Sequence, residues 1–146
     1  WALRGFMLAK LPLGLLAGLR IRALDAERCS VSVPYRWLTT NPFRSTYFAA
    51  LSMAAEMSTG ALGLTVVQAA PQKVSILIVG MQAEFVKKAT DVTTFTCTDG
   101  QAMAQAVAET LATGESVEVE ATSVGRSAQG HEVARFSFRW SFKRKG

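Results

Sequence analysis

The stretch that decides the fold is NPFRSTYFAALSMAAEMSTGAL, which occupies residues 41–62. It is rich in alanine, methionine and leucine, and after its arginine the only charged side chain is Glu56. A helix that is apolar on nearly every face is normally buried. Ser45 or Thr46 can act as the N-cap of such a helix. We therefore predict a buried helix over residues 45–62.

The residues before this helix predict a helical segment followed by two strands. Residues 1–19 are apolar at near-helical spacing, and Pro12 predicts a kink or two short helices. The apolar run within them is too short to cross a bilayer, so we expect no stable membrane insertion. From Arg20 onward apolar residues alternate with others, which is typical of half-buried strands near residues 21–23 and 29–33.

The chain after the helix is predicted to be mostly β-structure. The predicted strands cover residues 64–67, 74–87, 92–97, 117–124 and 133–142. Gly80 marks a bulge in the second strand, residues 127–130 suit a hairpin turn, and a short amphipathic helix is predicted over residues 101–111. A buried helix and long antiparallel strands predict one α+β domain, residues 1–146, with a sheet curled around the helix.

Composition and charge exclude several classes of protein. Hydrophobic residues make up 49% and charged residues 18%, which is too apolar for a disordered chain. The net charge of +5 favours an anionic partner, but the basic residues form no stripe with aromatics, so we expect no nucleic acid. Cys29, Cys97 and the single His131 lack the spacing of a metal site or a disulfide framework. We expect no metal, two buried thiols and a reducing, cytoplasmic location.

Residues 41–62 resemble the central-helix signature of the hotdog-fold thioesterases, more specifically the phenylacetate-pathway type and a related uncharacterised thioesterase-like group. That signature has an Asn or Gln, a His six residues later, two small residues, and an acid nine residues after the His. In this chain the pattern falls on Asn41, Tyr47, Phe48 with Ala49, and Glu56. Tyr47 therefore stands in the place of the His, and Phe48 in the place of the first small residue.

The resemblance implies a hotdog fold, in which a curved antiparallel sheet wraps around a long central helix, here with an extra N-terminal helix. The later segments AEFVKKATDVTTFTC and SVGRSAQGHEVARFSFRW resemble the two later hairpins of the family. The resemblance also implies hydrolysis of an acyl-CoA thioester, with coenzyme A as part of the substrate and no separate cofactor. It makes Glu56 the catalytic acid, the Phe48 N–H the oxyanion donor, and Asn41 a residue that orients water or the carbonyl.

The spacing of two of these groups predicts an oligomer. The Phe48 N–H and Glu56 are separated by about 12 Å along one helix, at ~1.5 Å per residue. Both groups therefore cannot touch the same carbonyl from one chain. If both act, the second comes from a neighbouring subunit, so we expect a composite site in a homodimer or a dimer of dimers.

Two further groups of residues are candidate substrate contacts. Ser45 and Ser52 lie in or beside the central helix. Tyr47, in the position of the His, is a catalytic candidate, although it also suits packing in the core or at an interface. Basic side chains can bind the phosphates of coenzyme A, or they can simply be solvated. The basic candidates are Lys87, Lys88 and Arg126.

Each functional assignment has an alternative. Glu56 can be a buried structural acid bonded to backbone or to Tyr47, Asn41 before a proline is an ordinary turn residue, and His131 suits a surface turn. A rival function is a non-catalytic hotdog protein that binds acyl-CoA or a fatty acyl group, since the His and the first small residue of the signature are lost. A dehydratase on the same fold would rely on a His, which this site lacks.

Overall fold

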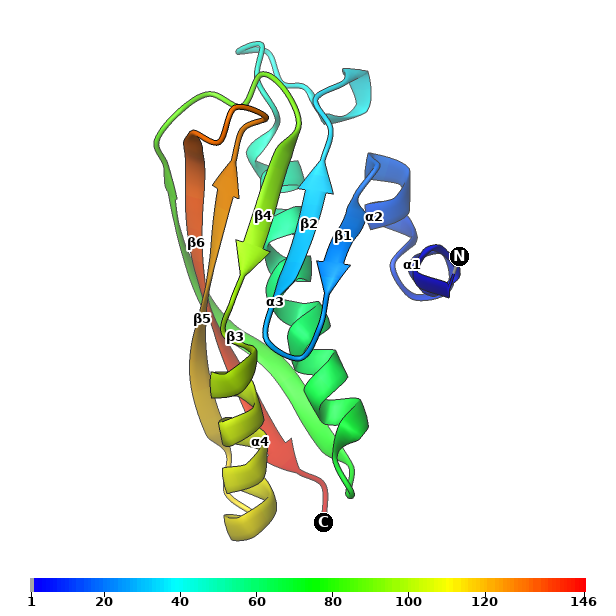
Figure 1. The fold of residues 1–146 in the computed structure, drawn as a ribbon, viewed down its shortest axis with the longest axis vertical. Coiled ribbons are helices and arrows are strands. Elements are labelled where there is room, and N and C mark those ends of the chain that lie inside the picture. Colours follow the sequence, from blue (N-terminus) through cyan, green and yellow to red (C-terminus); the bar gives the residue numbers. More distant parts are fainter. Residues whose placement is uncertain (1) are drawn as a thin grey trace.

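The computed structural model describes residues 2–146 (Figure 1), so Trp1, the first residue of the predicted helical segment, lies outside the described residues. The helices are α1 (Ala2–Lys10), α2 (Pro12–Ala17), the 3-10 turn η1 (Trp37–Thr39), α3 (Phe48–Ala69) and α4 (Gly100–Thr113). The strands are β1 (Arg20–Leu24), β2 (Cys29–Val33), β3 (Val74–Phe85), β4 (Thr93–Cys97), β5 (Val117–Arg126) and β6 (Glu132–Arg144).

The six strands form one antiparallel sheet in the order β1-β2-β4-β5-β6-β3. Figure 1 shows α3 running lengthwise behind this curved sheet, α4 below β4, and α1 and α2 beyond β1. In the described residues α3 is the one helix long and apolar enough to cross a membrane, and 50% of its most apolar window is buried in the fold. The curved sheet and its long central helix confirm the predicted α+β architecture.

The core forms where alternate residues of β6 face inward. These side chains are aromatic or small and almost completely buried: Ala134, Phe136, Phe138, Trp140 and Phe142. Phe136 stacks on Phe138 with ring centroids 5.7 Å apart and meets Phe95 of β4 edge-on at 5.5 Å. Ala54 and Ala55 of α3 are fully buried, and such small side chains let a helix approach the sheet closely. The predicted alternation of β6 is confirmed.

The start of α3 differs from the prediction. The helix begins at Phe48, and no side chain caps its first turn, so the prediction of Ser45 or Thr46 as the N-cap is wrong. The Ser45 hydroxyl hydrogen-bonds with the Asn41 side chain, and the Thr46 hydroxyl donates to a carbonyl of the β3–β4 loop. Because both hydroxyls are used elsewhere, the first N–H groups of α3 remain uncapped.

The end of α3 also differs, because the predicted strand over residues 64–67 is wrong and the helix continues to Ala69. Gly63 does not end the helix. It is buried, and a Cβ atom there would lie 2.7 Å from the Ile76 side chain of β3, so the glycine allows close packing. The helix stops before Pro71, since the residue ahead of a proline disfavours the helical conformation and Ala70 is extended with φ −72° and ψ 145°.

Other local predictions are confirmed. The N-terminal segment is divided into α1 and α2, and β3 has an irregular register between Ile78 and Gly80. Cys29 and Cys97 are buried free thiols that lie opposite each other in β2 and β4. Burial raises the pKa of Cys29 to about 11 and that of Cys97 to about 12. Both thiols are therefore poor nucleophiles near neutral pH.

Candidate active site

Glu56 lies near the middle of α3 with its side chain partly buried. Among the side chains that the structure describes, which exclude those of residues 1, 3 and 4, no hydrogen-bond donor and no cation pairs with its carboxylate. Burial acts without a compensating partner and raises the pKa of this carboxyl group above its ordinary range. A carboxyl group with a raised pKa can exchange a proton closer to neutral pH.

The carboxylate opens onto an apolar pocket of about 370 Å³, a volume typical of small-molecule sites. Helix α3 forms one wall, and α1, β1, β3 and β6 contribute the others. Among the lining side chains that the structure describes, Glu56 is the only charged one. Most of the other lining side chains are apolar: Phe6, Met7, Leu11, Ile21, Leu24, Met57, Leu64, Ile76 and Trp140.

Gly60 creates the space beside the carboxylate. A Cβ atom at this position would lie 3.0 Å from Glu56 Oε1 and 3.5 Å from the Trp140 ring. Trp140 does not pair with the acid, because its indole N–H donates to the Thr59 hydroxyl at 2.9 Å. The glycine one turn after the acid therefore leaves open space where a reacting group can approach.

The first turn of α3 provides a second chemical feature. Within the described residues, the N–H groups of Phe48 and Ala49 donate to no acceptor, and the helix dipole favours negative charge there. Tyr47 and Phe48 are about half exposed, and the Phe48 ring meets Phe85 of β3 at 6.4 Å. The Ser52 hydroxyl donates to the Phe48 carbonyl. Free N–H donors thus lie on an exposed, partly aromatic surface.

The loop before α3 is held together by Asn41. Its Oδ1 atom accepts the backbone N–H of Phe43 at 2.9 Å and that of Ser45 at 3.2 Å. Its Nδ2 atom donates to the Ser45 hydroxyl at 3.2 Å. Lys88 donates to the Phe43 carbonyl and ties this loop to the β3–β4 loop. Asn41 therefore positions the start of α3, and it does not line the pocket beside Glu56.

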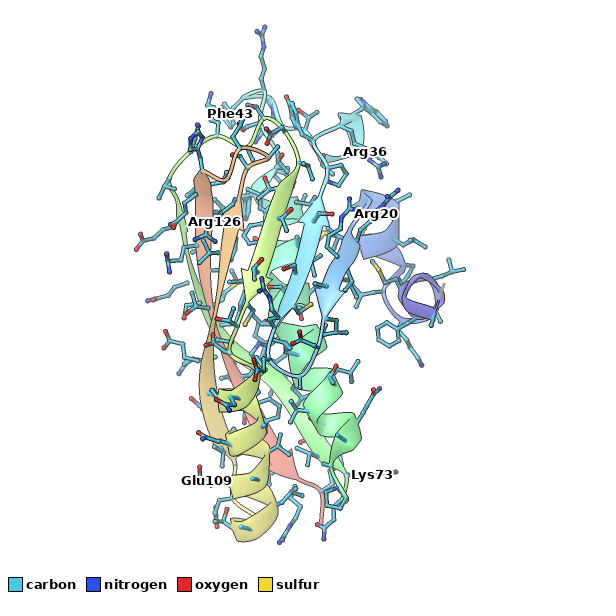
Figure 2. All side chains as sticks on the ribbon, viewed as in Figure 1. Arg20, Arg36, Phe43, Lys73, Glu109 and Arg126 are labelled. Atoms are coloured by element: carbon cyan, nitrogen blue, oxygen red, sulfur yellow. The ribbon has the colours of Figure 1, made fainter. Side chains whose placement is uncertain are left out.

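The remaining predicted contacts lie toward the same end of the sheet. The Lys87 ammonium is 3.4 Å from a ring nitrogen of His131, which is exposed beside the β5–β6 turn as predicted. Figure 2 shows Arg126 toward the end of the molecule where Phe43 lies. None of these residues lines the pocket beside Glu56. Within one chain, Glu56 and its pocket therefore lie apart from the predicted contacts near the start of α3.

The pocket walls are the part of the site that sequence reasoning missed. The alternation of β6 places Trp140 on the inner face, and this is confirmed. The contributions of Met7 and Ile21 depend on where α1 and β1 pack, which the pattern of residues 1–19 does not specify. In the described residues, no group of three or more His, Cys, Asp or Glu side chains is arranged to hold a metal ion.

Comparisons with known proteins bear on the family and the fold. A family model described as Domain of unknown function (DUF4442) matches residues 1–142, and no curated protein matches the chain. A Pseudomonas aeruginosa protein of unknown function, described as a probable thioesterase, is 21% identical with a TM-score of 0.83. The match covers 97% of this chain and 93% of that one. A Haemophilus influenzae thioesterase is 10% identical with a TM-score of 0.67, over 94% of this chain and 87% of that one.

Two structures of a Staphylococcus aureus protein, one described as a thioesterase enzyme, are each 12% identical with TM-scores of 0.69 and 0.68. The two matches cover 91% and 90% of this chain, and 99% and 98% of the Staphylococcus aureus chains. One has an alanine in place of a glutamate and the other has an alanine in place of a glutamine. These likenesses confirm the predicted hotdog fold.

The raised pKa of Glu56 predicts a pH-dependent stability difference. The fold accommodates the protonated form of Glu56 better than the charged form. The free energy of unfolding of the wild type is therefore highest below the ordinary glutamate pKa of about 4.3, and it falls as the pH rises through the higher pKa that Glu56 has in the folded state. We expect the melting temperature of Glu56→Gln to equal that of the wild type near pH ~4 and to exceed it by a growing margin toward pH ~8. Thermal unfolding across this range measures the difference, with the exposed Glu109→Gln on α4 as the control. A pH-independent difference would contradict the assignment.

Proposed function

The chain belongs to the family described as Domain of unknown function (DUF4442), and we propose that it hydrolyses acyl-CoA thioesters. The main support is the carboxylate of Glu56, which opens onto an apolar pocket and has no partner among the described side chains. Such a group can move a proton during catalysis, and the pocket beside it can take an acyl group. Thioesterases are also among the structures that share this fold.

In the proposed reaction the Glu56 carboxylate takes a proton from a water molecule, and the water oxygen attacks the thioester carbonyl carbon. The carbonyl oxygen becomes an oxyanion, which the free N–H groups at the start of α3 stabilise. The carbon–sulfur bond then breaks, and the protonated acid returns its proton to the leaving thiolate. The products are a carboxylic acid and the thiol of coenzyme A.

We propose that two copies of the chain complete each site. Glu56 and the Phe48 N–H are about 12 Å apart along α3, so one carbonyl needs them from different subunits. Strand β3 supports this pairing, because it lies at an edge of the sheet and has no proline, lysine or arginine in its 12 residues. Leu77, Met81 and Phe85 are exposed on it, and Phe85 contacts Phe48. Pairing along β3 would bury the surface that holds the start of α3.

The spacing of Asn41 and Glu56 gives additional support. The same number of residues separates them as separates the glutamine and the glutamate that were replaced by alanine in the Staphylococcus aureus protein. We infer that Asn41 positions the loop that leads into the oxyanion donors, through its hydrogen bonds to Phe43 and Ser45. Its role would then be to orient backbone rather than to contact the thioester.

The phosphates of coenzyme A require cations, and three are available. Lys88 lies at the loop that precedes α3, and Lys87 and Arg126 are exposed toward the same end of the sheet. Ammonium and guanidinium groups are the usual phosphate ligands of proteins. We propose that these side chains bind the coenzyme A portion near the start of α3, while the acyl portion enters the pocket beside Glu56.

The rival function is binding of acyl-CoA without hydrolysis. Tyr47 and Phe48 favour it, because they occupy the positions of the His and the first small residue of the thioesterase signature. Hydrolysis remains our proposal, since the acid is retained and a backbone N–H donor does not depend on the identity of its side chain.

Replacing Glu56 separates these two functions. Glu56→Gln keeps the shape of the side chain but removes the base, so we expect kcat for acyl-CoA hydrolysis to fall at least about 100-fold. Binding of acyl-CoA, measured by calorimetry, should persist, and Glu109→Gln on α4 should behave like the wild type in both assays. Undiminished turnover in Glu56→Gln would remove this residue from the mechanism. A wild type that binds acyl-CoA without releasing thiol would establish the rival function.

The backbone donor can be removed by a proline at position 48. Phe48 is the first residue of α3, where proline is well tolerated, and Tyr47 before it is extended with φ −57° and ψ 134°. Phe48→Pro therefore deletes one N–H group and keeps the helix. We expect kcat to fall about 100- to 1000-fold, whereas Phe48→Ala, which keeps the N–H, should lose much less. Equal losses in two variants of equal melting temperature would implicate the ring instead of the donor.

A further inference from the structure

The pocket beside Glu56 follows one face of α3. The residues that line it from this helix after the acid recur about one turn apart: Gly60, Ala61, Leu64, Thr65 and Gln68. At ~1.5 Å per residue this face extends about 18 Å from Glu56 to Gln68. Gln68 is exposed, so the far end of the pocket lies near the surface. The pocket is therefore elongated, with the acid toward one end.

The opposite wall is the N-terminal helical segment. Phe6, Met7 and Leu11 line the pocket from α1 and its end, and Met7 is only 2% exposed. Ile21 and Leu24 of β1 continue this wall. Figure 1 shows α1 beyond β1 and nearly end-on, so it lies across the direction of α3 rather than along it. The N-terminal segment thus forms a roof over the pocket.

The inner part of the pocket gives a polar acyl group few partners. Glu56 is the only charged residue among the lining side chains that the structure describes, the Thr65 hydroxyl donates to the Ala61 carbonyl at 2.8 Å, and the Trp140 N–H is used by Thr59. The amide of Gln68 lies at the exposed far end. A hydroxyl or second carboxylate on the substrate would lose its water there without gaining a hydrogen bond. A carboxylate would also meet the like charge of Glu56.

We propose that this pocket binds the acyl group of the thioester as an uncharged, flexible aliphatic chain, and that the N-terminal helix is the wall that limits its length. The inference rests on the proposed hydrolysis and adds to it the chemical class of the acyl group. Met7 and Met57 are unbranched and adaptable, which suits contact with a methylene chain. Burial of each methylene contributes about 0.8 kcal/mol, or about fourfold in kcat/KM.

The chain-length profile of the wild type tests this directly. We expect kcat/KM to rise about fourfold per methylene from acetyl-CoA upward and to level off once the acyl chain fills the pocket. Succinyl-CoA, which carries a second carboxylate, should react at least about tenfold more slowly than butyryl-CoA of the same carbon number. A flat profile, or equal rates for succinyl- and butyryl-CoA, would overturn the inference.

Two variants change the pocket in opposite directions. Ala61→Leu fills it, so we expect kcat/KM for decanoyl-CoA to fall at least about tenfold more than that for acetyl-CoA. Met7→Ala shortens a side chain of the pocket wall and so enlarges the pocket, which should shift the preferred acyl chain length toward palmitoyl-CoA. Ala104→Leu makes the same alanine-to-leucine change on the exposed face of α4 and should leave the profile as in the wild type. Equal effects of Ala61→Leu on short and long chains would overturn the inference.

Binding measurements separate failure of this inference from failure of the proposed hydrolysis. If the wild type hydrolyses no thioester in the series, the hydrolysis proposal fails, and Glu56→Gln can still be titrated with the same acyl-CoA molecules. An affinity that rises with chain length and falls for decanoyl-CoA in an Ala61→Leu background supports the aliphatic pocket. An affinity independent of chain length overturns it.

Discussion

The carboxylate of Glu56 faces mostly apolar side chains, and none of the side chains that the structure describes places a cation or donor beside it, so the loss of water destabilises its charged form. The surroundings preserve this condition in two ways. Trp140, which packs beside Gly60, has its N–H engaged by Thr59, and Gly60 keeps a Cβ atom away from the carboxylate. The acid is thus left both unpaired and accessible. A structural acid would be expected to have a partner, whereas a catalytic one needs this free space.

A second constraint comes from the length of α3. The uncapped N–H groups at its start and the acid in its middle are the two features that thioester hydrolysis needs, and the rigid helix holds them apart. We propose that a second copy supplies the missing half by pairing along the edge strand β3, where Phe85 contacts Phe48. The N-terminal helices lie at the opposite edge of the sheet, beyond β1, where they shape the pocket instead.

Much of this architecture was predictable from local patterns. A single charge in a long apolar stretch identified a buried helix and its acid, and the alternation of β6 identified the inner face that contains Trp140. The errors arose where tertiary contacts override local preference. Ser45 and Thr46 do not cap α3, because they bond to Asn41 and to the β3–β4 loop. Gly63 does not stop the helix, because β3 packs against it. The walls from α1 and β1 have no local signature, since they depend on how distant elements meet.

The central claim is that each site takes its acid from one protomer and its oxyanion donor from the partner. Co-expression of Glu56→Gln and Phe48→Pro chains, each inactive alone, tests it most directly. In a mixed dimer one site has both defects and the other has neither, so random pairing should restore about a quarter of wild-type turnover. Recovery to that level is the predicted result. Turnover that stays at the mean of the two inactive parents, in a preparation shown to contain mixed dimers, would contradict the account.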